Sequence, residues 1–119
     1  MLEFRREKKG IVVVLSLKGQ LDALTAGTMK PVMDELISSH SNRVVFNLDE
    51  LTLIDSSGVG VIVSIFKRAR ALGGDTKIAH LSKQPREVFR LLRLDKALSI
   101  FDTVDEAVDA FKSSPPPIN

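Results

Sequence analysis

The sequence predicts one α/β domain, with a mixed β-sheet, an opening antiparallel hairpin and helices packed on the sheet. Two apolar runs, Ile11 to Leu17 and Arg43 to Leu48, are rich in β-branched residues and nearly continuous. Such runs are typical of strands buried on both faces. Amphipathic segments with apolar residues three and four positions apart alternate with the strands. Alternating strands and helices favour crossovers, which would make part of the sheet parallel.

Turn and cap residues divide the chain into its expected elements. Lys18-Gly19-Gln20 should break the second strand, and Pro31 fits only near a first helical turn, so its helix can begin late. Gly73-Gly74 is a good helix stop, Pro85 suits a first turn, and Asp102 or Thr103 can cap the last helix. The expected strands are Leu2 to Glu7, Ile11 to Leu17, Arg43 to Leu48, Asp75 to Leu81 and Ala97 to Phe101. The expected helices are Thr25 to Ser38, Gly58 to Leu72, Gln84 to Leu92 and Asp105 to Lys112.

Length and composition fit a single globular domain spanning residues 1–112. The chain has 119 residues, enough for one sizeable core. Hydrophobic residues make up 44% and charged residues 27%, an ordinary balance for a soluble protein. Ser113 to Pro117 cannot continue a helix, so residues 113–119 are expected to form a disordered, proline-rich tail.

The composition argues against several classes of partner and site. With 17 basic and 15 acidic residues the net charge is only +2, and all of the few aromatic residues are Phe, so nucleic-acid binding is not expected. There is no cysteine, and the two histidines lie far apart, so neither a metal site nor a cofactor is expected. The longest apolar run, Ile11 to Leu15, is too short for membrane insertion, which favours a cytoplasmic protein.

The most informative segment is Asp55-Ser56-Ser57-Gly58, which precedes the strongest predicted helix. A hydroxyl in a first helical turn lies beside backbone N–H groups without intrahelical partners, at the positive end of the helix dipole. A phosphate could be bound there or attached there. The structural alternative is a helix cap, since Asp and Ser are preferred cap residues and Gly permits a tight turn.

The helix that follows carries an unusually wide apolar arc. One face needs only about 100° of apolar surface, but here Val61, Ile65 and Leu72 extend the stripe to nearly twice that width. Packing against a neighbouring helix would explain the extra residues. The alternative is a partly exposed apolar edge beside Ser57, as a protein-binding surface requires.

Several segments together resemble the STAS domain family, specifically the bacterial anti-sigma factor antagonists. The resemblance is carried by Asn47-Leu48, by Leu53 to Ile62 with its Asp-Ser-Ser-Gly element, by Gly19-Gln20-Leu21-Asp22, and by two C-terminal segments, Leu91 to Lys96 and Phe101 to Ala107. It covers nearly the whole chain. One departure is Arg93, where many relatives carry a small residue or Gly before Leu-Asp.

The resemblance implies a switch operated by phosphorylation. Ser57 would be phosphorylated by a cognate anti-sigma factor that is also a serine kinase. The unphosphorylated protein would bind that kinase and release a sigma factor, and a serine phosphatase would reset the switch. The expected partner-binding residues are Asp22, Asp55, Ser56, Gly58, Val61 and Ile65. Other subfamilies with this fold leave an alternative: a scaffold or transport accessory in which Ser57 is only a cap.

Catalysis by the domain itself is not expected. A serine nucleophile elbow requires Gly two residues before the serine, where this chain has Asp55. No phosphate-binding Gly-Lys-Ser or Gly-Lys-Thr loop occurs. His40 and His80 lie in predicted surface positions, away from the serines. The sequence therefore predicts a substrate of another protein's chemistry.

Overall fold

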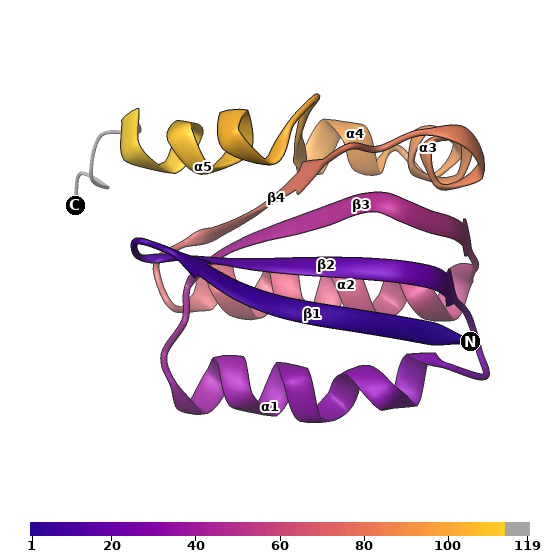
Figure 1. Ribbon diagram of the computed structural model, residues 1–119, viewed down its shortest axis with the longest axis horizontal. Coiled ribbons are helices and arrows are strands. Elements are labelled where there is room, and N and C mark those ends of the chain that lie inside the picture. Colours follow the sequence, from indigo (N-terminus) through magenta and orange to yellow (C-terminus); the bar gives the residue numbers. More distant parts are fainter. Residues whose placement is uncertain (114–119) are drawn as a thin grey trace.

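The computed structural model describes residues 1–113, which form an α/β domain around a five-stranded sheet (Figure 1). The strands are β1 (Leu2–Lys9), β2 (Val12–Leu21), β3 (Arg43–Ile54), β4 (Asp75–Ala79) and β5 (Ser99–Phe101). The helices are the 3₁₀ turn η1 (Ala26–Met29), α1 (Lys30–Ser38), α2 (Ser56–Ala71), α3 (Lys83–Leu91), α4 (Leu94–Ala97) and α5 (Val104–Ser113). Of the expected tail, Ser113 ends α5, and residues 114–119 lie outside the described residues.

The sheet has the predicted mixed topology. The strand order is β1-β2-β3-β4-β5; β1 and β2 are antiparallel, and the other neighbours are parallel. Gly10 and Ile11 form the two-residue loop of the opening hairpin, in which Gly10 has a φ of 65°. A positive φ at the first loop residue alone fits a type II′ turn, whose twist matches that of the flanking strands.

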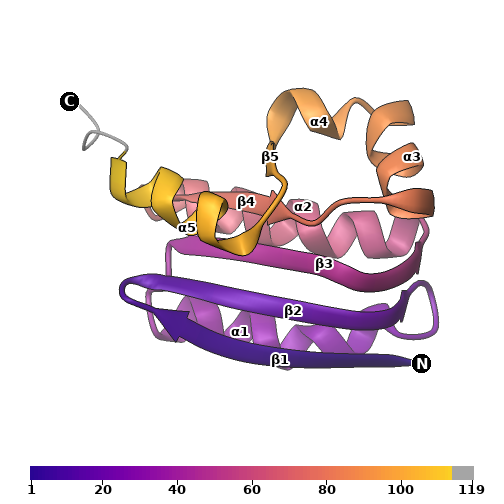
Figure 2. The same cartoon turned by 45° about the horizontal axis from the view of Figure 1, so that its top comes forward.

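Helices cover both faces of the sheet. Figure 2 shows α1 and α2 behind the sheet and α5 in front of it. The larger core lies on the α1 and α2 side and includes Val13, Leu15 and Leu17 of β2. The smaller core lies under α5 and includes Val12 and Val14. Burial of alternate residues on opposite faces explains why the β2 sequence is almost continuously apolar.

Three strands end later than the sequence predicts: β1 continues past Glu7 to Lys9, and the extensions of β2 and β3 are larger. Gly19 was expected to end β2, but the strand continues to Leu21, and β3 continues past Leu48 to Ile54. Register shifts on either side of Gly19 keep the two strands paired up to Leu21 and Ile54. Gly19 has a φ of 106°, and a Cβ there would overlap with the carbonyl oxygen of Met1. The glycine therefore supports an irregular strand rather than ending it.

Smaller differences follow from local backbone geometry. The late helix start allowed by Pro31 is confirmed, because η1 precedes α1. β4 ends at Ala79, since His80 adopts a positive φ of 56°. The short helix α4 was not predicted, and it reduces β5 to three residues. Thr103, not Asp102, caps α5: its hydroxyl accepts from Glu106 N at 3.1 Å, while Glu106 Oε1 accepts from Thr103 N at 3.1 Å.

Candidate functional site

The candidate site is the first turn of α2, at the end of the sheet where β2 and β3 finish. Asp55 is the N-cap residue, with extended backbone angles, and its Oδ1 accepts a hydrogen bond from Gly58 N at 3.0 Å. The helix therefore begins at Ser56, two residues before the predicted start at Gly58. The capping role of Asp55 that residue types suggested is confirmed.

Asp55 also joins the helix to the loop that follows β2. Its second oxygen, Oδ2, accepts from Ala23 N at 3.0 Å, and its backbone N donates to Leu21 O at 3.3 Å. One carboxylate thus bonds to backbone N–H groups of two segments more than 30 residues apart in sequence. Charge-assisted bonds of this kind are stronger than neutral ones. Asp55 fixes the position of the serines relative to the Asp22 loop.

Asp22 organises its own loop. Its Oδ1 accepts from Leu24 N at 3.0 Å and Thr25 N at 3.1 Å. The Thr25 hydroxyl donates to Gln20 O at 2.8 Å and lies 3.2 Å from the same Asp22 oxygen. Asp side chains commonly stabilise turns by accepting hydrogen bonds from backbone N–H groups a few residues further along the chain. Asp22 therefore shapes the loop next to the serines.

Ser57 lies in the first turn of α2 and is partly exposed, and Ser56 is exposed. Within residues 1–113 the hydroxyl of Ser57 makes no hydrogen bond, and neither do the backbone N–H groups of Ser56 and Ser57. The next N–H group, of Gly58, bonds to Asp55. An accessible hydroxyl thus lies beside two free donors and the positive end of a 16-residue helix.

Gly58 is buried where α2 begins. A Cβ at this position would overlap with Leu21 O and would lie 2.7 Å from Ile54 Cγ1. The absence of a side chain lets the helix start against the ends of β2 and β3. Gly58 is thus a close-packing position and offers no surface to a partner, which corrects its assignment as a partner-binding residue.

The apolar edge of α2 is narrower than predicted. Ile65 is only 3% exposed and belongs to the core, so its assignment as a partner-binding residue is corrected too. Packing on the sheet and against α1 explains its burial, as Met33, Leu36 and Ile65 line one small gap. Val61 is half-buried and remains on the rim of the site.

Two residues at the site were missed by sequence reasoning. Leu24, next to the Ala23 that bonds Asp55, is 91% exposed and is the most exposed leucine within residues 1–113. Gln84 of α3 bonds both backbone groups of Ile54, accepting from its N–H and donating to its C=O at 2.9 Å each. β4 ends too early to pair with Ile54, so the Gln84 amide takes the place of a neighbouring strand. No local sequence pattern signals either arrangement.

No helix within residues 1–113 is long and apolar enough to cross a membrane. The same residues contain no group of three or more His, Asp or Glu side chains placed to hold a metal ion.

Comparison with known proteins identifies the family. The STAS domain model matches residues 4–107. The chain belongs to the STAS domain family. A Thermotoga maritima protein named as an anti-sigma factor antagonist is 31% identical to this STAS domain over 82% of the chain and 88% of the relative.

Solved STAS structures agree in fold. The crystal structure of a Thermotoga maritima protein named as an anti-sigma factor antagonist matches with a TM-score of 0.87 and 29% identity, covering 92% of this chain and 94% of that one. The Bacillus cell fate determinant SpoIIAA in its phosphorylated form matches with a TM-score of 0.72 and 26% identity, over 91% of this chain and 98% of that one.

Proposed function

We propose that this STAS domain is an anti-sigma factor antagonist that is switched off by phosphorylation at Ser57. Unphosphorylated, it binds an anti-sigma factor that is also a serine kinase, and a sigma factor is released. A serine phosphatase removes the phosphate and resets the switch. The observation that carries the proposal is the partly exposed, unbonded Ser57 hydroxyl in the first turn of α2. Relatives named as anti-sigma factor antagonists and a phosphorylated SpoIIAA structure support it.

The domain tolerates a phosphate at Ser57. A phosphoserine adds a charge of about −1.5 to −2 and three acceptor oxygens. The free N–H groups of Ser56 and Ser57 and the helix dipole are placed to stabilise that charge. The fold therefore needs no rearrangement to accept it.

A partner packed over the same turn does not tolerate the phosphate. It would bury the new charge, at a cost of several kcal/mol unless a cation is supplied. The neighbouring carboxylates of Asp55 and Asp22 add like-charge repulsion. Every 1.4 kcal/mol corresponds to a factor of ten in affinity, so we expect phosphorylation to lower partner affinity by about two decades or more.

The contact surface follows from what is exposed around Ser57. Ser56, the rim residue Val61 and the loop from Asp22 to Thr25 surround the hydroxyl, and Leu24 is the apolar side chain available for insertion into a partner. Complete burial of a leucine side chain in a partner's pocket is worth about 1.5–3 kcal/mol. In this arrangement the STAS domain is the substrate of a kinase and supplies no catalytic group.

The test uses three variants with the cognate anti-sigma kinase and ATP. Ser57→Ala should abolish incorporation of phosphate and bind the kinase constitutively. Ser57→Asp should lose binding by about two decades or more while keeping the wild-type unfolding midpoint. Ser56→Ala, the matched control, should still gain one phosphate, located at Ser57 by peptide mass analysis.

Two outcomes contradict the proposal. If Ser57→Asp binds the kinase as tightly as wild type, the electrostatic switch is wrong. If the wild-type domain binds stably but gains no phosphate, Ser57 is not a phosphoacceptor and the domain acts as a scaffold.

A further inference from the structure

β1 is one of the two edge strands of the sheet, and no other strand within residues 1–113 pairs with its outer edge. Gln20 N donates to Met1 O at 3.0 Å, and this pair continues the unbroken β1–β2 register from Leu2 and Gly19. In an antiparallel pair, hydrogen-bonded and non-bonded residue pairs alternate. The odd-numbered residues of β1 therefore bond to β2, and the backbone groups of Leu2, Phe4, Arg6 and Lys8 face outward.

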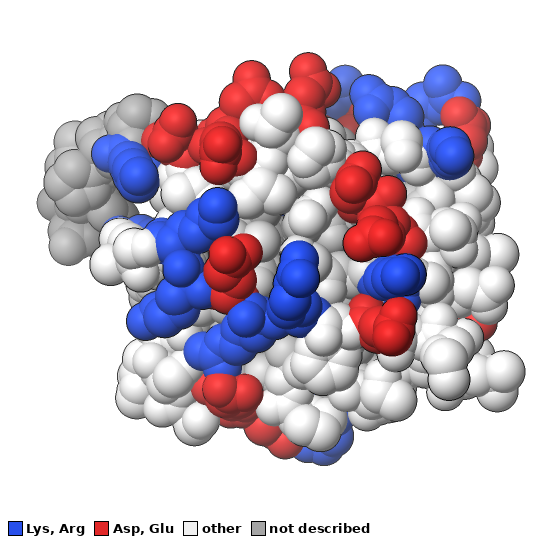
Figure 3. Space-filling model, in the orientation of Figure 1, with Lys and Arg blue, Asp and Glu red and all other residues white. Residues whose placement is uncertain are grey.

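The side chains of β1 form two sets, one on each face of the sheet. The odd set is Glu3, Arg5, Glu7 and Lys9. Glu7 and Lys9 lie opposite Val14 and Val12, so the odd set occupies the face that carries α5. Its charges alternate in sign along the strand, from negative at Glu3 to positive at Lys9. Figure 3 shows basic and acidic side chains interleaved over the side of the molecule that β1 and β2 form.

We propose that β1 pairs antiparallel with β1 of a second copy of this chain, with the two-fold axis at Arg6. This pairing places Glu3 opposite Lys9 of the second copy and Arg5 opposite Glu7 of the second copy. Because the two copies are equivalent, each contact occurs twice, and all four cross-strand pairs of the odd set are attractive. Opposite-charge pairs directly across a sheet stabilise it, and like-charge pairs destabilise it.

Charge excludes the neighbouring registers. The outward-facing groups belong to even-numbered residues, so the axis must pass through a residue and not between two residues. An axis at Arg5 places Arg5 opposite itself and Glu3 opposite Glu7. An axis at Glu7 places Glu7 opposite itself and Arg5 opposite Lys9. In both registers, the charged residues of the odd set that lie opposite one another across the interface have the same sign.

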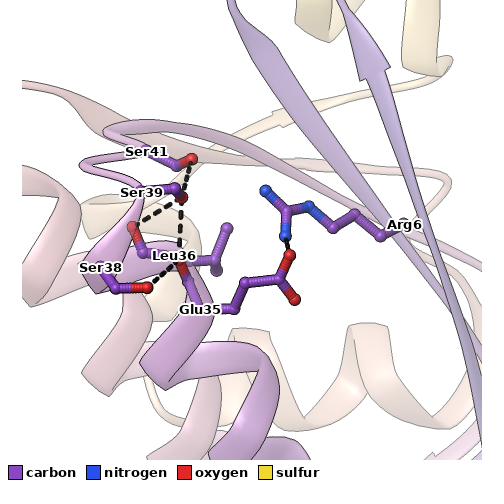
Figure 4. Close-up of polar contacts among 6 residues, drawn as sticks. All are labelled: Arg6, Glu35, Leu36, Ser38, Ser39 and Ser41. Carbon is purple, nitrogen blue, oxygen red and sulfur yellow. Dashed lines mark hydrogen bonds and ion pairs between the residues drawn. The ribbon is translucent and has the colours of Figure 1, made fainter.

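Arg6 itself would meet its equivalent in the second copy. Its guanidinium is turned toward α1 and forms an ion pair with Glu35, shown in Figure 4. Each Arg6 thus carries its own counter-ion and is drawn away from the strand edge. On the same face Phe4, which is 44% exposed, would lie opposite Lys8 of the second copy, whose methylene stem can cover the ring.

Charged edge strands usually prevent association. Here the alternation of sign favours the register with its axis at Arg6, which makes four opposite-charge contacts among Glu3, Arg5, Glu7 and Lys9, whereas an axis at Phe4 or Lys8 makes only two. The paired dimer would extend the sheet across both copies, and the antiparallel arrangement places the two Ser57 sites at opposite ends, both uncovered. A single pair of strands buries less than a stable interface needs, so the dimer is weak and concentration-dependent.

Disulfide trapping tests the register, because the chain has no cysteine of its own. Arg5→Cys, Arg6→Cys and Glu7→Cys are each oxidised mildly at a protein concentration of about 100 µM. Only the residue on the two-fold axis meets its equivalent. We expect Arg6→Cys to cross-link at least about tenfold faster than the other two. Equal rates at the three positions, or faster cross-linking at residue 5 or 7, would overturn the proposal.

Charge exchange tests the pairs without oxidation. By sedimentation equilibrium, Arg5→Glu should weaken self-association by about tenfold or more, and Arg5→Glu with Glu7→Arg should restore it to within about threefold of wild type. Lys67→Glu, an equal charge change on the exposed surface of α2, is the control and should have no effect. If Arg5→Glu dimerises like wild type, or the double variant fails to recover, β1 is not the interface.

Discussion

At the scale of the residue, two positions depend on whether a Cβ fits the local backbone. Gly58 permits the close approach of α2 to Leu21 and Ile54. At Arg93 a side chain is present although the backbone favours glycine. This residue adopts a left-handed φ of 57° before α4. The backbone at residue 93 would therefore suit Gly better than Arg.

We predict that Gly58→Ala is destabilising by about 2–3 kcal/mol, because the new Cβ would overlap with a backbone carbonyl that cannot move freely. The matched control is Gly60→Ala, on the same helix, where a Cβ meets nothing within 4 Å. This control should stabilise by about 0.5–1 kcal/mol through helix propensity. Urea unfolding measures both, and equal effects of the two substitutions would contradict the packing role of Gly58.

At the scale of the element, side-chain hydrogen bonds satisfy backbone groups that have no partner in a neighbouring strand. β3 extends beyond β4, so its last residue, Ile54, has no strand neighbour on that side. Gln84 supplies both missing hydrogen bonds from α3. The segment that carries Ser57 begins at the next residue, so α3 supports the position of the site.

We predict that Gln84→Leu costs about 1–2 kcal/mol, because the Ile54 N–H and C=O lose their partners. Hydrogen exchange of the Ile54 amide should accelerate. Glu87→Gln, on the same helix, breaks only an exposed pair with Arg90 and should change stability by less than about 0.5 kcal/mol. Unchanged Ile54 exchange in Gln84→Leu would show that the amide does not hold β3.

At the scale of the whole molecule, one helix covers the second face of the sheet. α5 buries Ala107, Val108 and Phe111 against β2, β3 and β4. The Lys77 ammonium lies 4.7 Å from the centre of the Phe111 ring and 3.4 Å from Asp75 Oδ2. A cation–π contact thus joins the sheet to α5 beside the smaller core.

We predict that Phe111→Ala destabilises the domain by about 3 kcal/mol, because Phe111 is only 9% exposed and closes the smaller core. Phe4→Ala, at the 44% exposed edge, is the control and should cost about 1 kcal/mol or less. Thermal unfolding compares the two at a protein concentration where the chain is monomeric. Similar losses would mean that α5 contributes little to stability.

The sequence by itself determined the alternation of strands and helices, the opening hairpin, the late start of α1 and the Asp-Ser-Ser-Gly segment at the start of α2. These features depend on residues close together in the chain: apolar periodicity, turn glycines and caps. Periodicity is less informative where a strand passes beyond the helices that cover it. There, polar residues such as Asp49 and Glu50 face solvent, which is why the predicted β3 ended too early.

Only the tertiary structure decided which of the predicted site residues reach the surface. Ile65 and Val61 belong to one apolar arc, but contact with the sheet and α1 buries Ile65 and leaves Val61 on the rim. The exposure of Leu24 and the bonds from Gln84 to Ile54 depend equally on segments distant in sequence. Exposure is set by what packs against a residue, and a periodic pattern records only which face of the helix it occupies.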